Sequence, residues 1–262
     1  MKWSWPRRPG RPLVIGHRGV RTAAATASWD GWETGGSTEP PENTLAAFEA
    51  AADRGADGVE LDVRVCGSGE LVVAHDPTLE RVTGGADHRP IAWVPYSELR
   101  RLDLGGGARL PLLAEVLALV RARRLYLNVE MKRDVPSRGA VVAATARLLS
   151  AVDPRQPLLV SSFDPLMLVG LGAALAGVPR ALLISPDGWY PKVARLARPL
   201  AFSAIHPNRT LTRVADVAAW RRGGLLVNVW TVNSPAEARD LAAIGVDGII
   251  TDDPRPIRDA LS

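Results

Sequence analysis

Cysteine is nearly absent from this chain of 262 residues, since Cys66 is the only one. A single thiol excludes an intramolecular disulfide and a zinc site built from several thiolates. Long apolar runs are missing as well, and no stretch approaches the roughly 18 residues that suggest a membrane span. The apolar stretch at residues 13–16 is shorter than the core of a signal peptide, which takes about 7–15 residues. We therefore predict a cytoplasmic protein that is not integral to a membrane.

Positive charge is in slight excess but is not concentrated anywhere. The sequence has 32 Lys and Arg against 28 Asp and Glu, which gives a net charge of +4 and a pI near 9.7. The basic residues are scattered, so no tract indicates a surface for nucleic acid. A small anionic substrate explains the excess equally well, and peripheral contact with lipid stays open.

Short apolar segments alternate with Ala- and Leu-rich helical segments along the whole chain, which is typical of βα units and a parallel sheet. Strands are expected at residues 12–17, 58–65, 125–132, 157–162, 180–184, 200–205, 225–232 and 247–251. Helices are expected at residues 43–55, 112–123, 139–152, 164–177, 190–197, 213–222, 234–245 and 253–262. Four helices have an N-cap residue, namely Asn43, Asp164, Ser234 and Asp253, and proline follows the last three.

Eight βα units predict one closed barrel of the α/β class. A (β/α)8 TIM barrel typically takes about 250 residues, so residues 1–262 are interpreted as a single domain. The basic, Pro-rich residues 1–12 are expected to be a flexible N-terminus.

Two long stretches fall outside this scheme: residues 20–41 form a long first βα loop, and residues 77–110 form an insertion after the second strand region. Both follow strands, so both are expected on the C-terminal face, where the active sites of barrels lie. Trp29 and Trp32 in the first stretch predict either a mobile cover over the substrate or indole packing on the barrel rim.

Acidic residues occupy alternate positions of two predicted strands. In GVELDVRV, Glu60 and Asp62 point to one side of the strand, and Glu130 repeats this pattern in LYLNVEMK. An unpaired carboxylate removed from water is costly, so we infer that a cation compensates them. Three carboxylates without cysteine or paired histidines favour a hard divalent cation, Mg²⁺ or Ca²⁺, over zinc.

Two histidines are expected at the same end of the barrel. His17 ends the first strand and His75 follows the second. With an ordinary pKa of about 6.5, each can donate or accept a proton near neutrality. Arg18 and Lys132 add fixed positive charge that suits an anion. A cation, two histidines and two basic side chains together indicate phosphoryl chemistry.

Further histidines and a tryptophan are weaker candidates. His206 follows the sixth expected strand and is a candidate for substrate contact, because strand ends on this face carry function. Trp230 points inward on the seventh expected strand. His88 lies in the insertion and is interpreted as an exposed loop residue.

The segments GHRG, PENTLAAFEAA, GADGVELDVRV, LVVAHDPTLERVTG, LNVEMK, SSFDP, VNVWTVN and GVDGIITDDP occur in this order. In this string, which covers nearly the whole chain, the sequence resembles the glycerophosphodiester phosphodiesterases. The resemblance implies a (β/α)8 barrel similar to that of phosphatidylinositol-specific phospholipases C, with residues 77–110 as an insertion characteristic of the family. It also implies metal-dependent hydrolysis of a glycerophosphodiester to an alcohol and glycerol 3-phosphate, in which the glycerol 2-hydroxyl attacks phosphorus.

The same resemblance implies roles for individual residues. Glu60, Asp62 and Glu130 become the ligands of one divalent cation, and His17 and His75 become the acid and base. The supporting and pocket-lining residues are Arg18, Glu42, Lys132 and Trp230. The chain departs from the family at residues 20–41, since members commonly have a short loop there, and this leaves the leaving alcohol open.

Other functions are weighed against this one. A metal-dependent amidohydrolase needs a His-x-His pair on its first strand, which the HRG motif lacks. A sphingomyelinase D-like enzyme is typically disulfide-linked, which the single cysteine disfavours. A phospholipase D-like or lyase activity on a lysophospholipid remains an alternative. So does a non-catalytic phosphate-binding barrel, although such a protein would lose a histidine or carboxylate that this chain retains.

Overall fold

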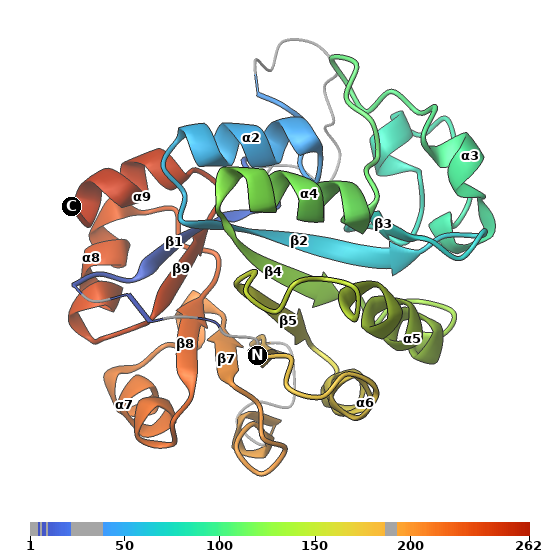
Figure 1. Cartoon of the computed structure of the whole chain (residues 1–262). Helices are drawn as coiled ribbons and strands as arrows, with labels where there is room; N and C mark the ends of the chain where they lie inside the picture. Colours follow the sequence, from blue (N-terminus) through green and yellow to red (C-terminus); the bar gives the residue numbers. More distant parts are fainter. Residues whose placement is uncertain (1–4, 6, 9, 22–38, 187–192) are drawn as a thin grey trace.

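Eight parallel strands close into a ring in the computed structural model, which describes residues 5, 7–8, 10–21, 39–186 and 193–262 (Figure 1). The strands of the ring are β1 (Leu13–His17), β2 (Gly58–Val65), β4 (Tyr126–Met131), β5 (Leu158–Ser162), β6 (Arg180–Ile184), β7 (Ala204–Pro207), β8 (Leu226–Val229) and β9 (Gly248–Thr251). Closure is complete because β1 pairs in parallel with both β2 and β9. The predicted TIM barrel is therefore confirmed.

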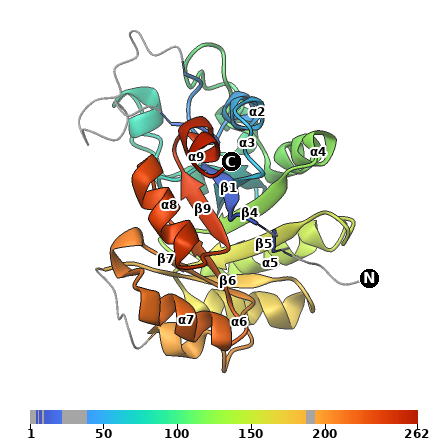
Figure 2. The same ribbon diagram turned by 90° about the vertical axis from the view of Figure 1, so that its left-hand side faces the viewer.

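Helices surround the ring of strands on the outside (Figures 1 and 2). They are α2 (Leu45–Asp53), α4 (Leu113–Arg123), α5 (Arg138–Leu149), α6 (Pro165–Ala174), α7 (Val214–Arg222), α8 (Pro235–Ala243) and α9 (Pro254–Ala260). The predicted caps Asp164, Ser234 and Asp253 each accept a backbone N–H, and proline begins each of their helices. The cap of α2 is Thr44 rather than Asn43, because the side-chain amide of Asn43 is bonded to Asp62 instead.

Other elements also differ from the sequence-based expectation. Strand β7 starts at Ala204, later than expected, because Phe202 still donates its N–H to Ala197 in the preceding turn. A short strand, β3 (Leu71–Val73), runs antiparallel to β2 and was not expected. Of the helix expected at 190–197, the described part is a 3-10 helix, η3 (Val193–Leu196), and residues 190–192 lie outside the described chain.

The outer and the inner faces of the strands each contact a different layer of the apolar core. Val59, Leu61 and Val63 on the outer face of β2 pack beneath the helices. The inner face forms a separate apolar layer, with Leu13, Ile15, Leu159, Ala181, Ala204 and Ile250. Polar inward residues lie farther along the strands, so the barrel is apolar at one end and polar at its carboxyl end.

The N-terminal residues that the structure describes contact the barrel. Trp5 is 6% exposed and joins the inner apolar layer, with its ring 5.8 Å from that of Tyr126. Arg11 pairs with Asp57 at 2.7 Å. Within residues 1–12, the stretch expected to be flexible, burial of this indole and this ion pair therefore hold the described residues against the barrel.

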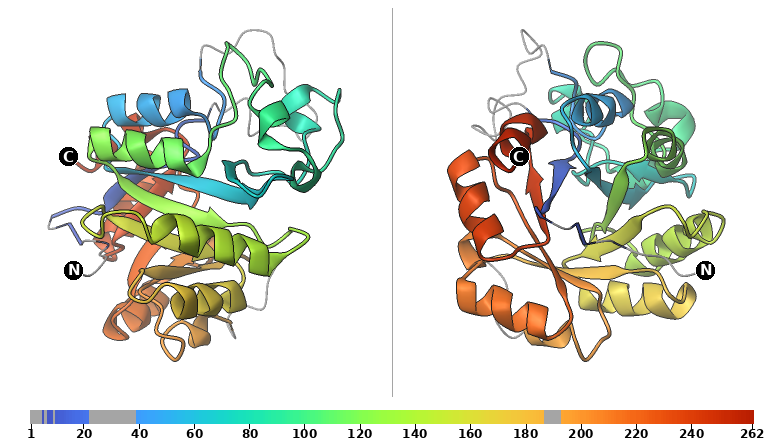
Figure 3. Two further views of the ribbon diagram at one scale, coloured as in Figure 1. Left: turned by 45° about the vertical axis from the view of Figure 1, so that its right-hand side comes forward. Right: turned by 60° about the vertical axis from the view of Figure 1, so that its left-hand side comes forward.

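The insertion has a small core of its own beside the carboxyl end of β2 (Figure 3). It contains η1 (Arg81–Thr83), η2 (Ile91–Trp93) and α3 (Tyr96–Leu99). Its buried residues include Leu79, Ile91, Val94, Leu99 and Leu104.

Residues 22–38, with Trp29 and Trp32, lie outside the described chain, so the role of that loop remains a prediction. Within the described residues, no helix is long and apolar enough to cross a membrane.

Candidate active site

Three carboxylates meet at the carboxyl ends of β2 and β4. Asp62 is paired in register with Glu130, and Glu60 with His17 of β1. One oxygen from each of Glu60, Asp62 and Glu130 lies within 4.8 Å of the others, and all three residues are buried. The inward acidic row that the alternation predicted is therefore one compact cluster.

Nearby positive charges stabilise the ionised form of Asp62 more than that of Glu60. Asp62 lies 3.2 Å from both Lys132 Nζ and Arg18 Nε and accepts the Asn43 amide at 2.9 Å. Burial acts to raise the pKa of Asp62, but the Lys132 and Arg18 charges hold it well below its usual range. Burial and the charges of Asp62 and Glu130 raise the pKa of Glu60 well above its usual range. Buried oxygen donors with uncompensated negative charge fit a hard divalent cation.

The turn after β1 explains how Arg18 reaches two of the acids. Arg18 has φ 52° and Gly19 has φ 87°, both in the left-handed region. A Cβ on Gly19 would lie 2.6 Å from the backbone of Ala47, so only glycine fits. This turn directs the Arg18 N–H to Glu60 at 3.1 Å, while its side chain pairs with Asp62. The HRG motif therefore supplies both a histidine and a donor to the acidic cluster.

Each histidine of the site is held by an aspartate. His17 Nδ1 lies 2.7 Å from Asp252 Oδ1, and His75 Nδ1 lies 2.7 Å from Asp76 Oδ1. Burial and the charge of Arg18 lower the pKa of His17 below its ordinary value. With Nδ1 engaged, Nε2 is the ring nitrogen left for a further contact.

Glu42 is a junction between three arginines. It accepts from Arg18 Nη1 at 2.9 Å and from Arg81 Nη2 at 2.8 Å, and it pairs with Arg21 Nε at 2.5 Å. Burial acts to raise the pKa of Glu42, but Arg18, Arg81 and Arg21 lower it to about 2. Glu42 is therefore ionised at neutral pH and binds Arg18, the same arginine that pairs with Asp62.

The same junction connects the two histidine–aspartate pairs. Arg81 also pairs with Asp76, the partner of His75. Arg21 Nη1 lies 3.7 Å from Asp252, the partner of His17. Sequence reasoning missed Asp252, Asp76, Arg81 and Arg21, although the quoted motifs HDPTLERVTG and GVDGIITDDP contain three of them.

Trp230 follows β8, which ends at Val229 rather than at residue 232 as expected, and it lies beside His206 of β7. Trp230 Nε1 donates to the His206 backbone oxygen at 2.7 Å, and its ring packs edge-on against Phe163 at 5.6 Å. His206 belongs to β7 rather than to the loop after it, and its exposed fraction is 0%. Its Nε2 lies 2.9 Å from the Asn228 amide nitrogen. The expectation that His206 follows a strand is therefore corrected, because β7 extends to Pro207 and encloses the ring. Contact of His206 with substrate stays a prediction.

The enclosed His206 predicts a pH dependence of stability. Burial lowers the pKa of His206 from 6.5 to about 3, so between these values the unfolded chain binds a proton that the folded chain does not. Stability due to this residue is therefore present above the unfolded pKa and is lost as the pH falls through this window. Between about pH 7 and about pH 5 the loss is about 2 kcal/mol. Urea unfolding of His206→Gln at both pH values should show a correspondingly smaller loss, and an equal loss in both proteins would contradict the prediction.

Lys132 predicts a dependence of stability on divalent cations. Its ammonium lies 2.9 Å from Glu130 and 3.2 Å from Asp62, and it is 8% exposed. Burial acts to lower the pKa of Lys132, but Asp62 and Glu130 raise it, so the side chain stays charged. In chelator, Lys132→Met leaves two buried carboxylates facing each other and should lose about 3–5 kcal/mol of unfolding free energy. Added Mg²⁺ or Ca²⁺ should recover part of the lost stability, as measured by thermal unfolding. Wild-type stability of Lys132→Met in chelator would contradict this prediction.

A barrel whose mouth carries buried acids, two histidine–aspartate pairs and clustered arginines defines a hydrolase of phosphate esters. The Glycerophosphoryl diester phosphodiesterase family model matches residues 21–255, and the chain belongs to that family. The predicted family and enzyme class, a glycerophosphodiester phosphodiesterase, are thereby confirmed.

Relatives and solved structures agree with this assignment. A glycerophosphodiester phosphodiesterase of Caldanaerobacter subterraneus subsp. tengcongensis is 29% identical, over 94% of this chain and 96% of the relative. One of Bacillus altitudinis is 31% identical, over 82% of this chain and 90% of the relative. The structure of an Oleispira antarctica phosphodiesterase in complex with the product sn-glycerol-3-phosphate matches with a TM-score of 0.79 and 28% identity, over 96% of this chain and 97% of that one.

Proposed function

We propose that this chain hydrolyses glycerophosphodiesters to an alcohol and glycerol 3-phosphate, with one divalent cation, Mg²⁺ or Ca²⁺, and with His17 and His75 as acid and base. The observation that carries the proposal is that the strand ends bring two histidine–aspartate pairs to one buried acidic cluster. The product bound to the Oleispira antarctica neighbour supports the substrate class.

The acidic and the basic residues of the site are assigned different roles. Glu60, Asp62 and Glu130 would hold the cation, which when bound supplies Lewis acidity at a phosphate oxygen and lowers the pKa of a neighbouring hydroxyl. Arg18 and Lys132 add fixed positive charge for the phosphate.

Proton transfer is assigned to the two histidines. One accepts the proton of the glycerol 2-hydroxyl, whose oxygen attacks phosphorus, while the other donates a proton to the departing alcohol oxygen. This attack forms a cyclic phosphate and releases the alcohol. The two histidines exchange roles in the second step, in which water opens the cyclic phosphate to glycerol 3-phosphate. Asp252 and Asp76 keep each ring in one tautomer, because each accepts from Nδ1. Glu42, through Arg21 and Arg81, keeps both aspartates in place.

Product identification by phosphorus NMR separates this function from its alternatives. The purified protein, with Mg²⁺ or Ca²⁺, is given a glycerophosphodiester with glycerol as the leaving alcohol, and in parallel a lysophospholipid. The proposal predicts glycerol 3-phosphate from the first substrate. A cyclic phosphate that accumulates from the lysophospholipid alone would favour the lyase, and no conversion of either would favour a phosphate-binding barrel.

A further inference from the structure

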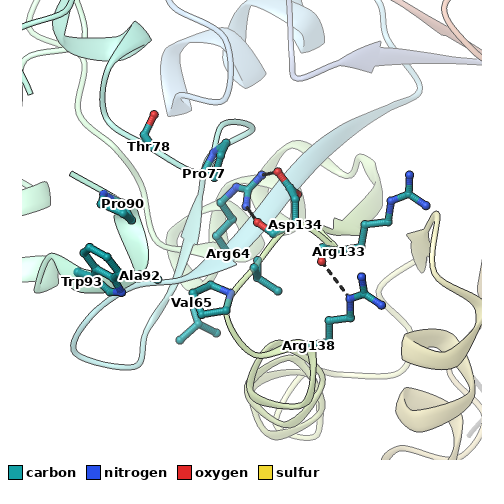
Figure 4. Close-up of a pocket in the computed structure, with 12 residues that line it drawn as sticks. Arg64, Val65, Pro77, Thr78, Pro90, Ala92, Trp93, Arg133, Asp134 and Arg138 are labelled. Carbon is teal, nitrogen blue, oxygen red and sulfur yellow. Dashed lines mark hydrogen bonds and ion pairs between the residues drawn. The ribbon is translucent and has the colours of Figure 1, made fainter. Parts of the chain in front are cut away.

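A cavity of about 470 Å³ lies between the insertion and the loop that follows β4 (Figure 4). This volume is within the range of small-molecule sites, about 300–1,000 Å³. One wall belongs to the insertion and includes Pro77, Pro90, Ala92 and Trp93. The opposite wall is formed by residues 133–136 and Arg138, and the end of β2 lies between the walls.

The cavity is joined to the catalytic histidine through a buried arginine. Arg64 is 3% exposed and donates to the His75 backbone oxygen at 3.0 Å from Nε and 2.6 Å from Nη2. The same guanidinium donates to Asp134 at 2.9 Å and 2.7 Å. Both walls also continue directly from site residues, since Pro77 comes two residues after His75 and Arg133 follows Lys132. The cavity therefore adjoins the His75 side of the candidate active site.

Within the part of the chain that the structure describes, one cationic side chain of the cavity lacks an acidic partner. Arg64 pairs with Asp134, and Arg138 pairs with Asp164 at 2.9 Å while donating to the Arg133 backbone oxygen at 3.0 Å. Among the described residues no carboxylate pairs with the Arg133 side chain, whose guanidinium lies over the Phe163 ring at 5.7 Å. Phe163 in turn packs against Trp230. The uncompensated charge thus lies between the barrel mouth and the cavity.

The remaining lining suits a bulky organic group. The cavity wall includes Val65, Ala92 and Val135, and the Trp93 side chain is 74% exposed beside it. An exposed indole on the rim of a cavity is typical of a ligand contact, because it offers a large rigid surface at little entropic cost.

We propose that this cavity receives the leaving alcohol, and that Arg133 selects diesters whose leaving alcohol carries a negative charge of its own, such as a further phosphate. A choline or ethanolamine leaving group would place a second positive charge near the unpaired guanidinium, whereas an anionic group pairs with it. The inference rests on the proposed function, because it assigns the specificity of that same site.

The test compares kcat/KM for three glycerophosphodiesters, whose leaving alcohols are choline, glycerol, and glycerol that carries a second phosphate diester. The wild type should prefer the last of these. Arg133→Gln should lower kcat/KM for this anionic substrate about tenfold, as expected for a lost charge-assisted hydrogen bond. It should change kcat/KM for the substrate with glycerol as leaving alcohol less than about twofold. Arg239→Gln, on the exposed side of α8, is the matched control and should change none of the three.

A second variant tests the volume of the cavity independently of its charge. Ala92→Trp places a large side chain in the cavity and should lower kcat/KM for the bulky anionic substrate relative to that for the glycerol substrate. If the wild type hydrolyses none of the substrates, the proposed function fails and this inference fails with it. If it hydrolyses them but neither Arg133→Gln nor Ala92→Trp alters their relative kcat/KM, only the inference is overturned.

Discussion

Alanine at His17 or at His75 is expected to lower kcat by about 100-fold or more in each case. Each substitution removes one of the two groups that we propose move protons between the glycerol hydroxyl, the leaving alcohol and water. Each also leaves its aspartate, Asp252 or Asp76, without the imidazole that it holds at 2.7 Å. Steady-state turnover of a glycerophosphodiester, with glycerol 3-phosphate measured directly, checks both variants.

His88→Ala provides the control for these substitutions. His88 lies in the insertion with 69% of its side chain exposed and with a 3.4 Å contact to Glu80. It should keep wild-type turnover, and circular dichroism should show all three variants folded. Near-normal kcat in a folded His17→Ala or His75→Ala protein would remove that residue from catalysis.

Glu60→Gln is expected to weaken divalent-cation binding by about 100-fold or more without destabilising the cation-free protein. Loss of a residue that merely supports a metal ligand already costs about 10–100-fold in affinity, so loss of a ligand should exceed that. The folded state raises the pKa of the Glu60 carboxyl, chiefly through burial and then through Asp62 and Glu130. An ionised Glu60 therefore opposes folding, and a neutral amide relieves this.

Calorimetric titration with Mg²⁺ and Ca²⁺ and thermal unfolding in chelator measure the two effects separately. Glu98→Gln, in α3 with 49% of its side chain exposed, is the control and should bind the cation like the wild type. Unchanged affinity in Glu60→Gln would mean that the acidic cluster is not the cation site. A large drop in unfolding temperature in chelator would assign Glu60 a structural role instead.

The barrel and the acidic cluster could be predicted because both follow from short periodicities. Alternation along a strand places Glu60 with Asp62, and parallel order then aligns Asp62 with Glu130 on the neighbouring strand. No long-range information is needed beyond the closure of the ring. The glycine of the HRG motif likewise has a local cause, since Gly19 is required by a turn against Ala47.

The partner of His17 and the partners of Glu42 could not be predicted from spacing. His17 and Asp252 are separated by 235 positions, and Glu42 and Arg81 by 39. Loops and opposite ends of the chain bring them together, and no periodicity indicates which acid meets which base. The start of β7 was missed for a related reason. Leu200 and Phe202 are residue types typical of strands, but Ala201 between them takes φ 54° in a turn, so β7 starts only after this turn.

Turnover of the chelated protein, followed by stepwise return of Mg²⁺ or Ca²⁺, tests the proposed chemistry as a whole. Chelation should abolish formation of glycerol 3-phosphate. Activity should then return in step with occupancy of the single site that calorimetry detects, and it should not return in Glu60→Gln at the same cation concentration. Full turnover by the chelated wild-type protein would contradict the proposal that a cation held by Glu60, Asp62 and Glu130 takes part in the reaction.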